Sequence, residues 1–152
     1  LMAVLPILQV PDIRLSQVAD EVSVLADALV ALADDMLATM YAASGRGLAG
    51  PQVGVLSRVF VMDATWKDTT PSPVVFVNPE IVSVSDQMST MAEGCLSIPG
   101  DLVDVTRPDV VTLRWRDVDG GFLEAGFNGF SAACVQHEID HLNGILITDT
   151  RA

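Results

Sequence analysis

The stretch CVQHEIDHLNG, residues 134–144, contains both histidines of the chain. His137 and His141 are four positions apart, and residues at that spacing lie one above the other on the same face of an α-helix. Their imidazole rings can therefore converge on one ion, with the carboxylate of Glu138 alongside. This H-E-x-x-H arrangement predicts a metal site in which Glu138 acts on a metal-bound water.

A third protein ligand has to come from outside this pair. Metzincin proteases have a third histidine where this chain has Ile147, and Asp149 is the only acidic residue after His141. Cys134 lies on the histidine face of the helix, but about 7.5 Å along the axis from the midpoint between the histidines, which is too far for its short side chain. Cys95, in the turn-like stretch EGCLS, can approach the ion from the other side. A thiolate and two imidazoles suit zinc or ferrous iron and leave one position open for water.

Two helices are predicted to frame the chain. Apolar residues recur at helical spacing from about Asp20 to Ala43, which predicts a long core-facing helix near the N-terminus. Ser44-Gly45-Arg46-Gly47 is expected to end this helix, because its two glycines release the backbone. A second helix is predicted to begin at Asn128 or Ser131, to carry the H-E-x-x-H motif and to end near Asn143-Gly144. The apolar stripe of the first helix consists of Leu25, Leu29, Leu32, Met36 and Met40.

Between the helices, from Arg58 to about Gly126, short runs rich in β-branched and aromatic residues predict a series of strands. Asn78-Pro79 and Ile98-Pro99-Gly100 are expected to interrupt them, and Asp119-Gly120-Gly121 is expected to form a hairpin turn. The closing ILI (145–147) is expected to be a strand. This order of elements predicts the α+β class, with antiparallel or mixed sheets around a central H-E-x-x-H helix and a single domain over residues 1–152. The runs are RVFVMDA, VVFVNPEIVSV, LVDVTRP, DVVTLRWRDVDG and GFLEAGF.

Composition excludes several classes of function. Hydrophobic residues make up 50% and charged residues 18% of the chain, which is typical of a compact soluble globule. The net charge is −12 with only 8 Lys and Arg, so no basic stripe is available for direct nucleic-acid binding. No apolar run approaches the roughly 20 residues that span a bilayer, and LMAVLPILQV lacks the basic flank and cleavage site of a secretory signal. Two cysteines need not form a disulfide in such a core-rich chain, so we expect free thiols and a reducing, cytoplasmic location.

The glycine-rich stretch GRGLAGPQVG, residues 45–54, has two possible roles. A phosphate-binding loop is disfavoured, because the stretch follows a helix instead of joining a strand to a helix, and no Lys-Ser/Thr pair follows it. Gly45 and Gly47 instead favour close approach of a peptide substrate that adds to the backbone as a strand.

Three separated stretches together resemble the motifs of the peptide deformylases: GRGLAGPQVG (45–54), EGCLSIPG (93–100) and QHEIDHLNGIL (136–146). Their order and separations are similar, and the resemblance extends over essentially the whole chain. It implies the peptide deformylase fold and an enzyme that removes the formyl group from N-formylmethionine on newly made polypeptides. It also implies one divalent metal per chain, Fe²⁺ in the cell, for which Zn²⁺, Ni²⁺ or Co²⁺ can substitute. The implied partners are N-formylmethionyl peptides and nascent chains at the ribosome of a bacterial-type cytoplasm, without nucleic-acid or membrane binding.

Carried over residue by residue, the resemblance makes Cys95, His137 and His141 the metal ligands. It makes Glu138 the general acid/base in the attack of metal-bound water or hydroxide on the formyl carbon. The side-chain amide of Gln52 and the backbone N–H of Leu96 are implied to bind the formyl oxygen. The implied substrate-binding residues are Gly45, Arg46, Gly47, Met91, Glu93, Gly94, Phe130, Ala133 and Cys134.

The chain departs from the family pattern at several points. Arg46 stands where an apolar residue is usual, Gly50 where alanine is usual, and Leu102 where a basic residue is often found. The sequence also ends at Ala152, whereas many bacterial deformylases continue into a helix that helps docking to the ribosome. Two alternatives therefore remain: a deformylase-like metal amidase that acts on another N-acyl peptide or a small formyl amide, and a metal-binding relative without catalysis. The presence of Glu138 and Gln52 argues against the second.

Overall fold

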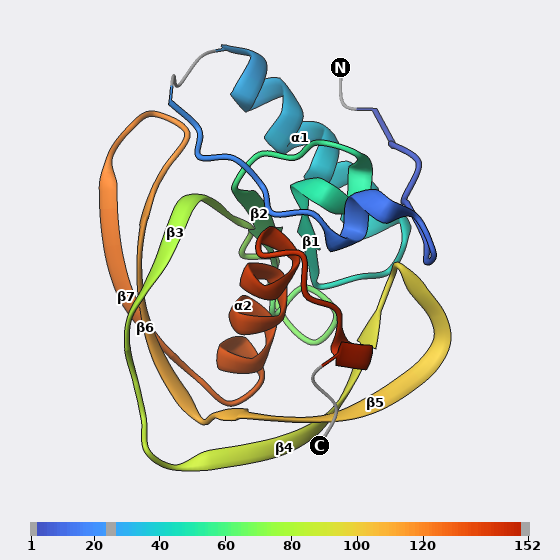
Figure 1. The fold of residues 1–152 in the computed structure, drawn as a ribbon. Coiled ribbons are helices and arrows are strands. Elements are labelled where there is room, and N and C mark those ends of the chain that lie inside the picture. Colours follow the sequence, from blue (N-terminus) through green and yellow to red (C-terminus); the bar gives the residue numbers. More distant parts are fainter. Residues whose placement is uncertain (1–2, 24–26, 150–152) are drawn as a thin grey trace.

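The computed structural model describes residues 3–23 and 27–149, which form a mixture of helices and antiparallel sheets (Figure 1). The predicted α+β class is therefore confirmed. In chain order the elements are η1 (Ile13–Ser16), α1 (Asp27–Ala42), β1 (Gly47–Ala49), η2 (Gly50–Val53), β2 (Val59–Met62), β3 (Val74–Val84), β4 (Met88–Cys95), β5 (Ile98–Pro108), β6 (Val110–Arg116), β7 (Phe122–Asn128), α2 (Gly129–Leu142) and η3 (Ile147–Asp149).

The strands form two antiparallel sheets that surround α2. One sheet has the order β1-β2-β3-β6-β7, and the other is the β4–β5 hairpin. Figure 1 shows α2 in the centre, with β3, β6 and β7 to one side and the hairpin passing beneath it. Strand β1 lies at an edge of the larger sheet, so its second edge is not paired within that sheet. The motif helix is therefore central, as predicted, and both sheets contribute walls around it.

Three apolar clusters hold these layers together. The largest packs one face of α2 against the larger sheet through a stack of aromatic rings that includes Phe60, Phe76 and Trp115. A second cluster joins α1 to β1 and β2, with Met36 and Met40 fully buried. A third joins the β4–β5 hairpin to η1 and η3. The hairpin that carries Cys95 is thus anchored by both ends of the chain.

The first helix is shorter than the sequence predicted. It begins at Asp27, whereas the prediction began at about Asp20. Asp20 instead forms a parallel bridge with Ser57, which holds this segment extended. The predicted stripe is confirmed at Leu29, Met36 and Met40, which are buried; Leu25 lies outside the described residues.

Two predicted breaks fall inside strands. Asn78-Pro79 lies within β3, where Asn78 has a φ of 49° and its side chain bonds to the backbone of Val22, so the irregularity is stabilised locally. Ile98-Pro99-Gly100 opens β5 instead of ending a strand. By contrast, the segment between β6 and β7 does turn at Asp119-Gly120-Gly121, with Asp117 N–H donating to the Gly121 carbonyl.

The chain end and two strands also differ from the prediction. ILI (145–147) is not a strand; η3 begins at Ile147, and Leu146 and Ile147 pack against the hairpin cluster. Strands β1 and β4 were not predicted, because neither GLA nor MSTMAEGC shows a clear strand pattern. Within the described residues no helix is long and apolar enough to cross a membrane.

Candidate metal centre and substrate pocket

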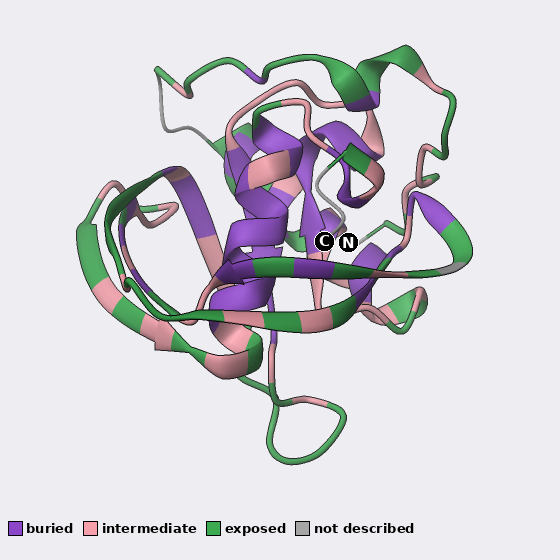
Figure 2. Ribbon diagram, turned by 60° about the horizontal axis from the view of Figure 1, so that its bottom comes forward, coloured by how far each residue is buried: buried purple, intermediate pink, exposed green. Residues whose placement is uncertain are grey.

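Helix α2 buries four polar side chains. Three are consecutive, Gln136, His137 and Glu138, and the fourth, His141, lies one turn later. Figure 2 shows this helix as buried along most of its length. A buried polar group costs free energy unless it has a partner. Gln136 is satisfied, because its Nε2 donates to the carbonyls of Pro108 and Ala132. The two histidines and Glu138 are therefore the groups available for chemistry.

The side chains of Cys95, His137 and His141 meet in one place. Their ligand atoms lie within 4.8 Å of one another, and Cys95 Sγ is 3.3 Å from His141 Nε2. Ligand atoms around one zinc ion lie roughly 3.5 Å apart, so this donor set fits a transition-metal ion with little rearrangement. Nδ1 of His141 and Oε1 of Glu138 are buried without a hydrogen-bond partner among the described residues. The chemistry and spacing of the three side chains thus suit a bound cation.

A network of charged side chains holds the ring of His137 in one orientation. Its Nδ1 is 3.1 Å from Oε1 of Glu93, and Glu93 in turn accepts from Nε and Nη2 of Arg107 at 2.8 and 2.9 Å. Arg107 Nη1 also donates to Asp140 on α2 at 2.8 Å. A carboxylate on the far nitrogen of a metal-binding histidine orients the ring and leaves Nε2 for the metal. Arg107 and Asp140 were not predicted, because only the fold brings β5 beside α2.

The electrostatics of the site favour a positive charge between its carboxylates. Burial lowers the pKa of His137, but the negative charge of Glu138 and the contacts with Cys95 and Glu93 outweigh it and raise the pKa to about 10. Burial raises the pKa of Glu93, yet the hydrogen bonds from His137 and Arg107 prevail and lower it. Burial also raises the pKa of Glu138, to about 7. The surroundings of His137 thus stabilise a cation, which can be a proton or a metal ion.

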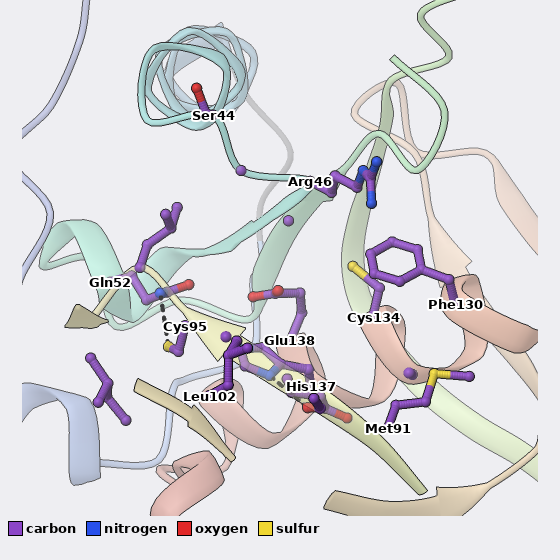
Figure 3. A pocket seen from close by; sticks show the side chains of 18 of the residues that line it. Ser44, Arg46, Gln52, Met91, Cys95, Leu102, Phe130, Cys134, His137 and Glu138 are labelled. Atoms are coloured by element: carbon purple, nitrogen blue, oxygen red, sulfur yellow. Dashed lines mark hydrogen bonds and ion pairs between the residues drawn. The ribbon is translucent and has the colours of Figure 1, made fainter. Parts of the chain in front are cut away.

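Gln52 and Leu96 lie next to the metal-ligand group. The Gln52 side chain is anchored by its Oε1, which accepts from the N–H of Ala49, and its Nε2 points to Ser97 Oγ at 3.1 Å and to Cys95 Sγ at 3.8 Å. Figure 3 shows this amide directed at Cys95. Leu96 follows Cys95 in the two-residue turn between β4 and β5. Both residues line the same pocket as Glu138.

The pocket has a volume of about 730 Å³ and opens to the surface beside β1, the β4–β5 hairpin and α2. Every predicted catalytic or substrate-binding residue lines it, and of the predicted metal ligands only His141 lies behind the wall. Glu93, predicted to bind substrate, lines the pocket but also supports His137. None of the other lining residues was predicted to bind substrate, although Ile98, Pro99 and Gly100 belong to the stretch EGCLSIPG. They are Ser44, Lys67, Ala92, Ile98, Pro99, Gly100 and Leu102.

Gly45 and Gly47, two of the glycines that line the pocket, leave space for neighbouring side chains. A Cβ on Gly47 would lie 2.5 Å from Oε2 of Glu138 and 3.0 Å from Sγ of Cys134, and one on Gly45 would lie 2.9 Å from Cδ1 of Leu96. Neither glycine has a positive φ; after α1 that conformation falls on Ser44, with a φ of 58°. The helix does end just before this stretch, at Ala42, but the positive φ belongs to Ser44 and not to the glycines, which leave space beside Leu96, Cys134 and Glu138.

The model of a protein family described as polypeptide deformylase matches residues 4–152. The chain belongs to this family. A peptide deformylase from Zymomonas mobilis is 45% identical over 152 residues, which cover 97% of this chain and 86% of the relative. The crystal structure of a peptide deformylase from Thermotoga maritima superposes with a TM-score of 0.93 at 35% identity and covers 98% of both chains. A class I type b peptide deformylase from Acinetobacter baumannii, solved with Met-Ala-Ser bound, gives a TM-score of 0.91 at 37% identity over 99% of both chains.

The predicted family, fold and enzyme class are thus confirmed: the chain is a deformylase. Deformylases are metalloenzymes, and the group formed by Cys95, His137 and His141 is suited to hold the metal. Cys134 stands outside that group, and its thiol stays neutral, because burial and the nearby charge of Glu138 raise its pKa well above the usual value. Both cysteines are free, as expected.

Two departures from the deformylase pattern, Arg46 and Leu102, line the pocket, and a third, Gly50, lies at the start of η2. At Gly50 a Cβ would come within 2.8 Å of the Val55 carbonyl oxygen and 2.9 Å of that of Ser57, so this deformylase has no room there for alanine. Leu102 is exposed on β5 at the pocket rim. Arg46 lines the pocket and stacks on the ring of Phe130.

Proposed function

We propose that this deformylase removes the formyl group from the N-terminal formylmethionine of newly made polypeptides, with Glu138 as general acid/base beside a metal held by Cys95, His137 and His141. The observation that carries the proposal is the convergence of these three ligand atoms within 4.8 Å beside a buried carboxylate of raised pKa. We infer that residues 1–152 act as one catalytic domain, in the cytoplasm and on chains emerging from the ribosome.

The donor set supports a transition metal, and we propose Fe²⁺ as the metal in the cell. One thiolate and two imidazoles suit iron or zinc better than the oxygen ligands preferred by Mg²⁺ or Ca²⁺. When bound, such a cation lowers the pKa of water to about 7 and polarises a carbonyl oxygen. The ion pairs of Glu93 with Arg107 and His137 keep the His137 ring directed into the site.

Glu138 is positioned to move the proton. Its Oε1 is buried without a partner among the described residues, and burial raises its pKa to about 7. A general acid/base is most effective when its pKa lies near the working pH. Glu138 therefore takes a proton from the attacking water and delivers it to the leaving amine. The amide of Gln52 and the N–H of Leu96 bind the negative charge that develops on the formyl oxygen.

The walls of the pocket suit a methionine side chain followed by an extended peptide. Met91, Phe130, Ala133 and the neutral thiol of Cys134 provide an apolar lining, and the unpaired edge of β1 can accept an added strand. The relative from Acinetobacter baumannii was solved with Met-Ala-Ser bound, which is the peptide that deformylation of formyl-Met-Ala-Ser leaves. We infer the same substrate class for this chain.

The test is the release of formate from formyl-Met-Ala-Ser by iron- or nickel-loaded protein. Acetyl-Met-Ala-Ser and N-formylglycinamide serve as the matched alternatives, since the first carries another acyl group and the second is a small formyl amide. We expect rapid turnover of formyl-Met-Ala-Ser alone. Preference for either alternative substrate would point to a related amidase, and stoichiometric metal without turnover of any substrate would point to a protein that only binds metal.

A further inference from the structure

Arg46 lies on the side of the pocket away from the metal ligands. Figure 3 shows its side chain beside Phe130, apart from Gln52 and Cys95. The guanidinium carbon is 5.1 Å from the centre of the Phe130 ring, and Nη2 donates to Asp68 Oδ2 at 3.1 Å. Stacking holds an arginine side chain in one orientation while its N–H groups remain available for a carboxylate. Arg46 is therefore an ordered cation in the pocket wall, not a side chain extended into solvent.

The carboxylate that binds Arg46 is exposed and can be displaced. The side chain of Asp68 is 71% exposed, against 28% for that of Arg46. Nε of Arg46 is buried and has no hydrogen-bond partner among the described residues. The N–H groups that a ligand can reach are therefore those of Nη1 and Nη2, and among the described residues only Nη2 has a hydrogen-bond partner, Asp68. A substrate carboxylate could form a forked pair with the guanidinium in place of the single bond to Asp68.

A second positive charge lies nearby on the same loop as Asp68. Lys67 lines the pocket, and no ion pair among the described residues includes it. The loop is fixed against the pocket, because Nε1 of Trp66 donates to the carbonyl of Gly45 at 2.9 Å and Tyr41 OH donates to Asp63 at 2.6 Å. Arg46, Lys67 and Asp68 together leave one net positive charge at the pocket mouth, in a chain whose net charge is −12.

The geometry of a strand shows which part of a substrate would meet this charge. In an extended peptide, side chains alternate between two faces, so the first and third residues point to the same side about 7 Å apart. When the first residue occupies the part of the pocket lined by Met91 and Phe130 and the peptide runs away from the metal ligands, its third residue points toward the rim formed by Arg46 and Lys67. The second residue points to the opposite side.

We propose that Arg46 is a specificity-determining residue that favours formylmethionyl peptides with a carboxylate side chain at the third residue, an inference that rests on the proposed deformylase reaction at the same site. Arg46 exchanges Asp68 for the substrate carboxylate, and Lys67 adds to the attraction. The contact lies at the rim and is partly screened by water, so its effect is about two- to five-fold in kcat/KM.

The experiment compares formyl-Met-Ala-Glu, formyl-Met-Ala-Gln and formyl-Met-Ala-Lys, all as C-terminal amides so that a side chain provides the only carboxylate. For the wild-type protein we expect kcat/KM to be about two- to five-fold higher for the Glu peptide than for the Gln peptide, and lower for the Lys peptide. The ratio should approach one at high ionic strength, because salt screens an exposed pair.

Three variants locate the effect. Arg46→Gln should reduce the Glu-to-Gln ratio to about one, and Asp68→Asn should increase it, since the competing carboxylate is gone. Arg114→Gln is the matched control: it removes the same charge from an exposed ion pair with Glu124 on the β6–β7 strands, and it should retain the wild-type ratio. Equal kcat/KM for the Glu and Gln peptides in the wild type, or an unchanged ratio in Arg46→Gln, would overturn the inference while leaving deformylation intact. Failure to release formate from any peptide would instead contradict the proposed function.

Discussion

Glu138 combines features that a purely structural carboxylate would not have. It is buried, its Oε1 lacks a partner among the described residues, and Gly47 leaves its Oε2 the space that a Cβ would occupy. Burial raises its pKa to about 7, which suits proton transfer in both directions. A buried carboxylate oxygen without a partner lowers stability, and the proposed acid/base role would account for its presence.

Glu138→Gln should abolish turnover, with a loss of at least about 10²- to 10⁴-fold in kcat, because an amide cannot accept the proton. The variant should still bind one metal ion per chain, since Glu138 is not among the three proposed ligands. Formate release and metal analysis of the purified variant measure the two effects separately. Loss of the metal together with activity would make Glu138 a ligand.

The two cysteines should respond in opposite ways to the same substitution. Cys95→Ser should lose most of the metal, because a hydroxyl is a poor substitute for a thiolate. Cys134→Ser should retain it, because Cys134 lies outside the ligand group. Metal content after dialysis checks both variants, and Cys134→Ser serves as the control for general damage to the core. The opposite result would exchange the roles of the two residues.

Much of this site follows from residue types and spacing, and the rest depends on the fold. The two histidines are four residues apart, so a helix alone brings them together. Cys95 was favoured as the third ligand because the side chain of Cys134 is too short to reach an ion between the histidines. Arg107 and Lys67 could not be predicted. Each is far from the histidines in the sequence, and only the fold brings it close to the site. Glu93 was predicted to line the site, but its hydrogen bond to His137 depends on the position of β4 beside α2, which the sequence does not show.

At the scale of elements, β1 and η2 are packed so tightly that a methyl group at Gly47 or Gly50 would lie closer than 3.0 Å to a neighbouring atom. Gly47 approaches Glu138 on α2, and Gly50 approaches the carbonyls of Val55 and Ser57. Such packing could not be predicted from GLA, which is too short to show a strand period. β4 escaped prediction for a related reason: its pairing with β5, rather than its own pattern, makes it a strand. Long patterned segments, such as α1, β3 and β6, were found because their periodicity is local.

Gly47→Ala should reduce kcat by about 10- to 100-fold, since a displacement of about 1 Å in a catalytic group can cost about 10²-fold. The new Cβ would lie 2.5 Å from Oε2 of Glu138, which must move away. Stability should decrease less than for the same change at Gly50, because the atoms displaced at Gly47 belong to the side chains of Glu138 and Cys134, whereas those at Gly50 are backbone carbonyls. Steady-state kinetics and thermal unfolding test the two statements; an unchanged kcat with a raised KM would mean that the glycine serves substrate approach alone.

Tyr41 on α1 reports on the contact between this helix and the end of β2. Burial raises the pKa of Tyr41 to about 12, with a further contribution from its hydrogen bond to Asp63. Because the folded-state pKa is the higher one, the associated stabilisation is complete below the unfolded value of about 10 and is lost as the pH rises toward 12. Tyr41 is the only tyrosine, so tyrosinate absorbance gives its titration directly.

We expect the midpoint of this titration near pH 12 in the folded protein and a lower midpoint in Asp63→Asn, which retains burial but removes the charge. Circular dichroism at each pH confirms that the protein is still folded. A wild-type midpoint near pH 10, the value of a free tyrosine, would contradict the part-buried hydrogen bond to Asp63.

At the scale of the whole molecule, the excess of acidic residues contrasts with the basic rim of the pocket. The net charge of −12 repels anionic peptides at long range, but the Debye length is only about 8 Å at physiological ionic strength. A carboxylate that reaches the rim therefore interacts mainly with Arg46 and Lys67. The negative surface and the local positive charge can act at different distances without cancelling each other.

The two sides of the metal centre are far apart in the chain, with Cys95 at the end of β4 and His137 in α2. An ion bound to both would act as a reversible cross-link that closes the segment 95–137. Because such an ion would bind the folded chain and leave the unfolded one, its stabilisation would follow from its affinity, about 2.7 kcal/mol at a free metal concentration about 100 times the Kd, or roughly 5–10 °C in Tm for a domain of this size. We therefore expect a chelator to lower the Tm of metal-loaded protein by about that amount and to leave Cys95→Ser unaffected. Equal melting of loaded and stripped wild-type protein would contradict this coupling. The metal that serves the reaction would then also stabilise the fold. An enzyme that lost its metal would lose part of its resistance to unfolding together with its activity.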